Sequence, residues 1–478
     1  MSGQLTVYQD NPRYFAIDGR PEFLTGATPT WTPVSDPDCD FAAENRALVE
    51  HGGNFTRILA FFPGHALVPW AVIEGRTAPN GGPVYDLAAW NEAYWDRLRA
   101  YLDDCMQRGI VVCLELFDEP SIRYDKGPRV RWDAHPFNPD NNELLTTDDG
   151  LPAGRHGPAV RELYDAVRLP HMKRVLQHQR RYVEKLLETT VPYSQAIIYS
   201  ICNEYTYNEG SADVLDKTHA FAFPRYWADF VHQWGASRGC RLLTAMMPGR
   251  APSPGCYFED VEFRRYLGSD SFDAIDMAEN PAPADAWAGS FDGIANQSGD
   301  RLAQVLKRYY GRWTAWQEQA GLVKPLFNSK ILCRCVTDRR PPSPEPVWAL
   351  FFLGAAVSRC HRPHASPEGD IDGQRTTIAR LRRFVDKVPF WSMRPHHELV
   401  AGDVMCLAEP GEQYALFAPS GGPIAMYLPE SRRYEVEWCD VQSGEFITGD
   451  ATQGAAGGVV IRPPFRGPAA AVVRKVRS

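Results

Sequence analysis

The sequence has no segment that marks a secreted or membrane protein. Its first residues, Met-Ser-Gly-Gln-Leu-Thr-Val, contain neither a positively charged stretch nor an apolar core, so we predict no signal peptide. No apolar run approaches the length of a membrane span. We therefore expect a cytoplasmic protein, or a secreted one if a leader was trimmed, and no membrane partner.

The charges and cysteines exclude further classes of protein. The net charge is −8 and no block of Lys or Arg stands out, which argues against a nucleic-acid partner. The 11 cysteines are scattered without CxxC pairs or zinc spacing, and no set of His, Asp or Glu shows ligand spacing. We therefore predict no metal site and no cofactor. No glycine-rich phosphate turn follows the first predicted strand, which disfavours a doubly wound nucleotide-binding sheet.

The residues that are present alternate between apolar strands and amphipathic helices, after a predicted hairpin at 5–25. The predicted strands are 22–28, 54–60, 110–117, a strand from 196, 241–247, 272–277 and 324–329, with a last apolar run at 346–357. The predicted helices are 40–51, 90–108, 165–189, 222–238, 300–320 and 373–388. About eight strand–helix units in succession predict an α/β fold of the (β/α)8 TIM-barrel type over residues 1–395.

The pattern changes after Pro395. Short alternating apolar runs follow, and Gly, Pro and Ser turns separate them. Such a succession predicts a small C-terminal antiparallel β-sandwich domain at 396–478. This domain either packs on the barrel as a structural element or binds a glycan.

The stretch from Ala196 to Tyr207 is the most informative one. Its isoleucine-rich start is typical of a strand buried on both faces, and it ends abruptly in the polar and aromatic residues Asn203, Glu204 and Tyr205. A barrel enzyme presents its catalytic groups at the carboxyl ends of its strands. Glu204 is therefore a candidate catalytic acid, and the alternative is a capping or ion-paired Glu in an ordinary loop.

Other predicted strands also end in polar residues, which belong at the same face of a barrel. Taken strand by strand, the candidates are Arg57; Glu115 and Asp118; Asn203, Glu204 and Tyr205; Asp276 and Glu279; Asn328 and Lys330; and, in the last unit, Arg359 and His361. His361 either contacts substrate or belongs to a solvated polar loop.

These features resemble the large clan of retaining glycoside hydrolases built on (β/α)8 barrels. The resemblance rests on the Asn203-Glu204 pair that ends the fourth strand, on Arg57 in the second strand, and on Lys-Pro-Leu-Phe at 324–327. It spans nearly the whole chain. Within the clan, the segment Trp-Asp-Ala-His-Pro-Phe-Asn at 132–138 and the tail after 438 look like a group that pairs a cellulase-like barrel with a small C-terminal β domain.

The resemblance implies roles for several of these residues and an oligo- or polysaccharide as the partner. Glu204 would be the general acid/base, Asn203 would hydrogen-bond the sugar 2-hydroxyl, and Arg57 would support the second carboxylate. Trp132 and His135 would be subsite residues. Retaining hydrolysis requires two carboxyl groups about 5–5.5 Å apart, one of them a nucleophile, and in the clan this nucleophilic Glu closes the seventh strand.

The sequence departs from the clan at the end of the seventh strand. Where Phe-Asn-Ser-Glu is expected, it has Phe-Asn-Ser-Lys, ending in Lys330. A lysine cannot form the glycosyl ester, and within about 6 Å it would lower the pKa of Glu204. No acidic residue lies between Glu318 and Asp338, so a small register error does not restore the nucleophile.

Three explanations of this departure remain open. The first is a different second carboxylate: Glu279 or Asp276 on strand six, or Glu115 or Asp118 on strand three. Such a residue, ~6.5–9.5 Å from Glu204, could act as the base of an inverting mechanism.

The second explanation is that Lys330 and Arg334 bind an anionic group, such as a uronate or a sulfated sugar. The third is a barrel that has lost hydrolysis and only binds sugars. Outside these three, Lys330 could serve a lyase or an aldolase, because a lysine in an apolar pocket can form a Schiff base.

Overall fold

The structure, a computed structural model, describes most of the chain. The described residues are 3–122, 131–154, 160, 162–205, 217–248, 260–277, 299–331, 345–360, 371–429, 432–455 and 457–476.

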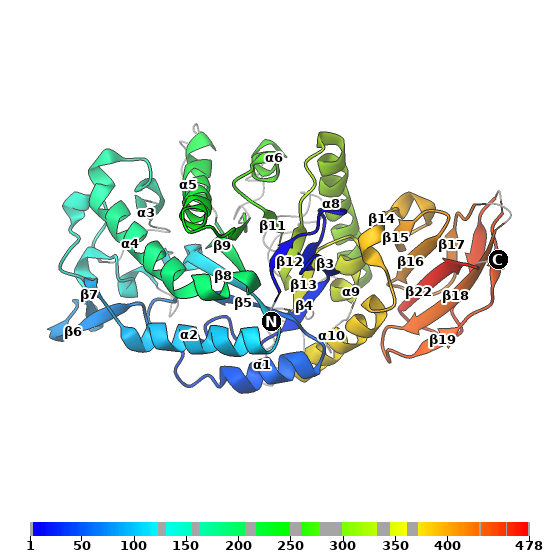
Figure 1. The fold of residues 1–478 in the computed structure, drawn as a ribbon, viewed down its shortest axis with the longest axis horizontal. Helices are drawn as coiled ribbons and strands as arrows, with labels where there is room; N and C mark the ends of the chain where they lie inside the picture. The colour runs from blue at the N-terminus through cyan, green and yellow to red at the C-terminus, as the bar shows by residue number, and fades with distance from the viewer. Residues whose placement is uncertain are drawn as a thin grey trace. The chain divides into compact units, whose positions relative to one another are not determined.

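Eight strands form the central sheet (Figure 1), and the predicted (β/α)8 TIM barrel is confirmed. The strands lie in the order β4-β13-β12-β11-β10-β9-β8-β5 and run parallel. Their bounds are β4 (Leu24–Ala27), β5 (Phe55–Leu59), β8 (Val111–Asp118), β9 (Ile197–Asn203), β10 (Leu243–Met246), β11 (Ala274–Asp276), β12 (Leu326–Ile331) and β13 (Val357–Cys360). Most of these residues are buried, as expected for parallel strands covered by helices.

The two ends of this strand order meet beside Asn54, so the barrel is nearly closed. The Asn54 N–H donates to the Thr25 carbonyl at 2.9 Å, and the Asn54 Oδ1 accepts from the Thr25 N–H at 2.8 Å. Gly26 allows this approach, because a Cβ there would lie 2.1 Å from the Phe55 carbonyl oxygen. A residue with a side chain at position 26 would therefore force the first strand away from the second.

Helices connect the strands, and their apolar residues recur at helical spacing. The helices are α1 (Phe41–Glu50), α2 (Glu92–Gln107), α4 (Lys173–Thr190), α5 (Lys217–Ala236), α6 (Asp260–Gly268), α8 (Gly299–Ala320), α9 (Glu345–Phe352) and α10 (Ile371–Val385). In α2, for example, Trp95, Leu98, Leu102 and Cys105 are buried on one face, three or four residues apart. This face packs on β8 and on α4.

One predicted helix begins later than expected. The prediction was 165–189, whereas α4 begins at Lys173 after a short helix α3 (Glu162–Asp165). Pro170 explains the difference, because a proline disfavours the helical conformation of the preceding residue. Leu169 is accordingly extended, with φ −96° and ψ 116°.

Two further segments differ from the prediction. The apolar run at 346–357 is mostly the buried helix α9, and β13 begins only at Val357. A continuous apolar run does not distinguish a buried strand from a buried helix. A hairpin of β6 (Trp70–Thr77) and β7 (Pro83–Trp90) was not predicted, and its register is irregular.

The chain forms two compact units, each assembled from segments that are distant in the sequence. The first unit consists of Met1–Gly3, Thr30–Arg46 and Arg57–Asn280. The second consists of Gln4–Pro29, Ala47–Thr56 and Pro281–Ser478.

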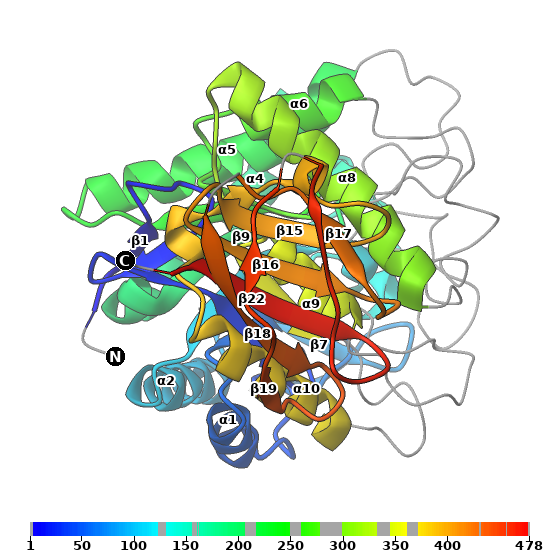
Figure 2. The same ribbon diagram turned by 90° about the vertical axis from the view of Figure 1, so that its right-hand side faces the viewer.

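The second unit contains the predicted antiparallel C-terminal region (Figure 2). Its larger sheet has the order β14-β15-β16-β22-β18-β19, with β20 also paired to β18. A two-stranded sheet of β17 and β21 shares one apolar core with it, in which Ile424 and Ile461 join Trp438. The strands are β14 (Arg394–Pro395), β15 (Met405–Glu409), β16 (Gln413–Ala418), β17 (Ile424–Met426), β18 (Arg433–Asp440), β19 (Phe446–Thr448), β20 (Thr452–Gln453), β21 (Val459–Ile461) and β22 (Ala469–Lys475). The domain boundary at 395/396 stays a prediction.

The predicted N-terminal hairpin is part of a three-stranded sheet in the same unit. It consists of β1 (Leu5–Val7), β2 (Phe15–Ile17) and β3 (Arg20–Glu22). The turn at Asp18-Gly19 has positive φ at both residues, 52° and 73°, as a two-residue type I′ hairpin turn requires.

A largely buried carboxylate connects β10 to β11 at their amino ends, in the first unit. Asp273 Oδ2 accepts hydrogen bonds from the Thr244 N–H at 2.8 Å and from His232 Nε2 at 3.0 Å, and Oδ1 accepts from Arg241 at 2.9 Å. Burial alone would raise the pKa of Asp273. The hydrogen bonds from His232, Thr244 and Arg241 outweigh burial, and the net pKa is lowered.

We predict that Asp273→Asn destabilises the protein by about 1–3 kcal/mol at pH 7, because it weakens a largely buried, hydrogen-bonded anion. A carboxyl with a lowered folded pKa stabilises the fold above its unfolded pKa, near 3.8, and this contribution disappears as the pH falls through the folded value. Urea unfolding at several pH values should therefore show a gap between the wild type and the variant that narrows below pH 3.8. Asp270→Asn, on the exposed part of the same loop, is the control. A gap that stays constant with pH would contradict the assignment.

Candidate active site

A buried ion pair connects the second and third barrel strands in the first unit. Arg57 on β5 donates to both carboxylate oxygens of Glu115 on β8, through Nε at 2.8 Å and through Nη2. Each of these residues is only 1% exposed. A two-point bond between a guanidinium and a carboxylate fixes the orientation of both groups, and here it extends to a third strand.

The third strand contributes Asn203, the last residue of β9. Arg57 Nη2 donates to Asn203 Oδ1 at 2.6 Å, and Asn203 Nδ2 donates to Asp118 Oδ1. Asp118 and Asn203 are register partners on neighbouring strands, so their side chains emerge together at the carboxyl end of the sheet. The amide of Asn203 is thus held between a cation and an anion, and both of its ends are oriented.

Glu204 follows directly and leaves the strand in an unusual conformation. Its φ is +51°, in the left-handed region, and it is partly exposed, unlike the buried residues before it. This conformation costs an L-residue on the order of 1–2 kcal/mol, and such strain gathers at functional sites. The next residue, Tyr205, is anchored by its N–H to the Met247 carbonyl at 3.3 Å. The backbone therefore turns at Glu204 between two fixed neighbours.

Burial and charge act in opposite directions on Arg57. Burial alone would lower its pKa, but the nearby carboxylates of Glu115 and Asp276 raise it, and the net pKa is raised. Asp276, at the end of β11, is itself fully buried. Arg57 therefore stays charged, and the structure brings Arg57, Glu115, Asn203, Asp118 and Asp276 into one electrostatic neighbourhood.

Behind the strand ends, Cys202 and Tyr164 form a second contact that sequence reasoning did not identify. The Tyr164 hydroxyl lies 3.8 Å from Cys202 Sγ. Burial, followed by the charges of Asp118 and Glu119, keeps the pKa of Cys202 well above its usual value. Cys202 is therefore a protonated packing residue rather than a nucleophile.

The aromatic candidates are buried in the structure. Tyr205 stacks on Phe223 at a ring distance of 5.9 Å, and Trp132 stacks on His135 at 5.1 Å. The Phe137 N–H donates to His135 Nδ1, and burial lowers the pKa of His135 to about 3. His135 is thus neutral. These contacts show that the rings pack against neighbouring rings, and their expected role in substrate binding stays a prediction.

The ends of the seventh and eighth strands, β12 and β13, lie in the second unit and carry one buried basic side chain each. Lys330 is 5% exposed, and its N–H donates to Asn328 Oδ1 at 3.0 Å. Arg359 on β13 donates to the Ser329 carbonyl at 3.0 Å and to Thr28 Oγ1 at 2.6 Å. Arg359 therefore links β13, β12 and β4 beside Lys330.

The remaining candidates, Glu279, Arg334 and His361, lie outside the described residues. Within the part of the chain that the structure describes, no group of three or more His, Cys, Asp or Glu is arranged to hold a metal ion. Among the same residues, no helix combines the length and the apolar character that crossing a membrane requires.

We predict that Arg57→Ala lowers the free energy of unfolding by about 3–5 kcal/mol, because it leaves Glu115 buried without its cation. The double variant Arg57→Leu/Glu115→Leu should lose less, since no unpaired charge remains. Urea unfolding followed by tryptophan fluorescence measures both. Arg99→Ala, which breaks an exposed pair with Asp96, should cost less than about 1 kcal/mol. A single Arg57 variant no less stable than the double variant would contradict this account.

Comparison with known proteins identifies solved structures with a similar fold. No family model and no curated protein matches the sequence. A solved glycoside hydrolase is 12% identical, with a TM-score of 0.60 over 99% of this chain and 97% of that one. A glycoside hydrolase of family 5 from Bacteroides vulgatus is 13% identical, with a TM-score of 0.61 over 98% of this chain and 93% of that one. The chain therefore has the barrel fold of these glycoside hydrolases.

Proposed function

We propose that the protein hydrolyses a glycosidic bond of a carbohydrate, with Glu204 as the general acid/base. The observation that carries this proposal is the chain of buried bonds from Glu115 through Arg57 and Asn203 to Asp118. It holds Asn203 rigidly next to a partly exposed glutamate at the carboxyl ends of the strands. Barrel enzymes place their reacting groups there. The fold shared with two glycoside hydrolases supports the same function.

In this mechanism, Glu204 donates a proton to the leaving glycosidic oxygen while the second carboxylate attacks the anomeric carbon and forms a glycosyl ester. Glu204 then removes a proton from the water that cleaves this ester. Asn203 supports the reaction by orientation. Its Oδ1 accepts from Arg57, and its Nδ2 has a second hydrogen, besides the one on Asp118, that can meet a sugar hydroxyl. Arg57, kept charged by its carboxylate neighbours, stabilises negative charge at the site.

Asp118 is the described residue best suited to be the second carboxylate. Glu115 has both oxygens engaged by Arg57, and Asp276 is fully buried. Asp118 is 7% exposed and faces Asn203 across one strand spacing, which is about 4.8 Å. We therefore assign Asp118 as the partner of Glu204. Glu279 remains the alternative.

A second candidate function is sugar binding without hydrolysis, with an anionic sugar as the ligand. The observation that favours it is the pair of buried cations, Lys330 and Arg359, at the ends of β12 and β13. A glycan that raises the melting temperature of the wild type, with no turnover, would favour this candidate. Trapping of a substrate on Lys330 by borohydride would instead favour the lyase or aldolase chemistry.

For hydrolysis, we predict that Glu204→Gln lowers kcat at least ~100-fold on nitrophenyl glycosides that the wild type cleaves, because proton transfer is lost. Azide should restore part of the rate with good leaving groups, since it replaces the water that Glu204 activates. Melting temperature should change little. Glu188→Gln, exposed on α4, should keep full activity. Undiminished hydrolysis by Glu204→Gln would disprove the assignment.

The second carboxylate is tested by the pair Asp118→Asn and Asp276→Asn. We expect the first variant to lose as much kcat as Glu204→Gln, while its substrate affinity, measured by equilibrium binding, stays within about tenfold. The second should retain turnover and lose stability, because it weakens a buried anion near Arg57. The reverse pattern would assign the role of second carboxylate to Asp276. Full activity in both variants would leave Glu279 as the candidate for that role.

A further inference from the structure

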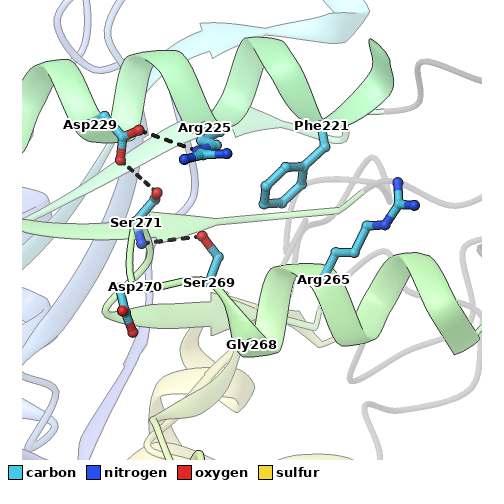
Figure 3. A pocket seen from close by; sticks show the side chains of 8 residues that line it. All are labelled: Phe221, Arg225, Asp229, Arg265, Gly268, Ser269, Asp270 and Ser271. Atoms are coloured by element: carbon cyan, nitrogen blue, oxygen red, sulfur yellow. Dashed lines mark hydrogen bonds and ion pairs between the residues drawn. The ribbon is translucent and has the colours of Figure 1, made fainter. Parts of the chain in front are cut away.

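A polar pocket opens on the first unit between α5 and α6 (Figure 3). Its volume is about 540 Å³, within the range of roughly 300–1,000 Å³ that is usual for small-molecule sites. One wall comes from α5. The opposite wall comes from the end of α6 and from the loop that leads into β11.

The wall on α5 is a straight row of three side chains. Phe221, Arg225 and Asp229 are spaced four residues apart and therefore lie on one face of the helix. Eight residues of helix rise by about 12 Å. Figure 3 shows Phe221 and Arg225 projecting from α5 toward α6. The row is long enough to contact more than one sugar ring.

Contacts within the protein already orient most of this lining. The Ser271 hydroxyl donates to Asp229 Oδ1 at 2.6 Å, and Arg225 Nε lies 3.5 Å from Asp229 Oδ2. The Phe221 ring packs at a steep angle against Tyr266, with the ring centres 5.1 Å apart. The pocket thus has an ordered polar end and an aromatic end. Little side-chain conformational entropy would therefore be lost when a ligand binds.

The formal charges of the lining cancel. Two arginines, Arg225 and Arg265, and two aspartates, Asp229 and Asp270, line the pocket, so it carries no excess charge that would select an anion or a cation. A neutral molecule with many hydroxyl groups suits this arrangement, because each hydroxyl both donates and accepts hydrogen bonds. The apolar face of a sugar ring can also pack on Phe221.

We propose that this pocket is a second carbohydrate-binding site, distinct from the site at Glu204. The loop with Ser269 and Asp270 leads into the amino end of β11, whereas Glu204 follows the carboxyl end of β9. In a barrel of parallel strands these are opposite ends. The loop end of the pocket therefore lies at the opposite end of the barrel from the reacting groups, and this role does not depend on the proposed hydrolysis.

The test measures how many oligosaccharides bind per chain. Cellotetraose, mannotetraose, xylotetraose and inorganic phosphate are titrated calorimetrically into the full-length Glu204→Gln protein, in which turnover is blocked. The same titrations are made in that background with Arg225→Ala/Asp270→Ala, which changes two exposed side chains, and with Phe221→Leu, which keeps apolar packing but removes the ring. Gln233→Ala, exposed on α5 outside the pocket, is the matched control.

We expect at least one tetraose to bind at a site that both pocket variants weaken at least about tenfold and that Gln233→Ala leaves intact. Binding at the Glu204 site should persist in the pocket variants. Loss of binding at one site can therefore be distinguished from loss of binding at the other. Oligosaccharide binding that the pocket variants leave unchanged would overturn the proposal. So would binding of phosphate alone, or no binding of any tetraose outside the site at Glu204.

Discussion

The buried cation of Arg57 is the group on which the rest of the candidate site depends. A guanidinium at 1% exposure is stable only when carboxylates replace its lost water, and Glu115 does this through a two-point bond. The same guanidinium donates a hydrogen bond to Asn203, and the Asn203 amide donates one to Asp118. Three strands are therefore held in one register at their carboxyl ends by a single charge.

This arrangement explains why a strained residue is tolerated beside it. Glu204 lies in the left-handed region, and it leaves a strand whose last side chain is bonded on both sides. The Tyr205 backbone is held to the end of β10. Rigid neighbours on both sides can impose a conformation that an isolated loop would avoid. Rigidity of this kind is also what a catalytic acid needs, because its position must be set before the substrate arrives.

Much of the fold could be predicted because its signals are local. Isoleucine-rich and valine-rich runs mark the buried strands, and apolar residues at helical spacing mark helices such as α2. The errors arose where local signals were ambiguous or weak. Pro170 shortens α4, and the apolar run before Val357 is a helix. The hairpin of β6 and β7 has an irregular register and little alternation.

The candidate site was predictable only as a set of strand ends. The sequence identified Arg57, Asn203 and Glu204, but the bond from Arg57 to Asn203 joins residues 146 positions apart. The orientation of the Asn203 amide, the positive φ of Glu204 and the burial of Trp132 and His135 depend on packing between distant segments. Periodicity and composition carry no information about such contacts.

The most direct test of this account is a crystal structure of the Glu204→Gln protein soaked with an oligosaccharide that the wild type cleaves. The account predicts a glycosidic oxygen within hydrogen-bonding distance of residue 204 and a sugar hydroxyl on Asn203 Nδ2, with the bond from Arg57 to Glu115 intact. An oligosaccharide bound at the barrel with its scissile bond remote from residue 204 would contradict it.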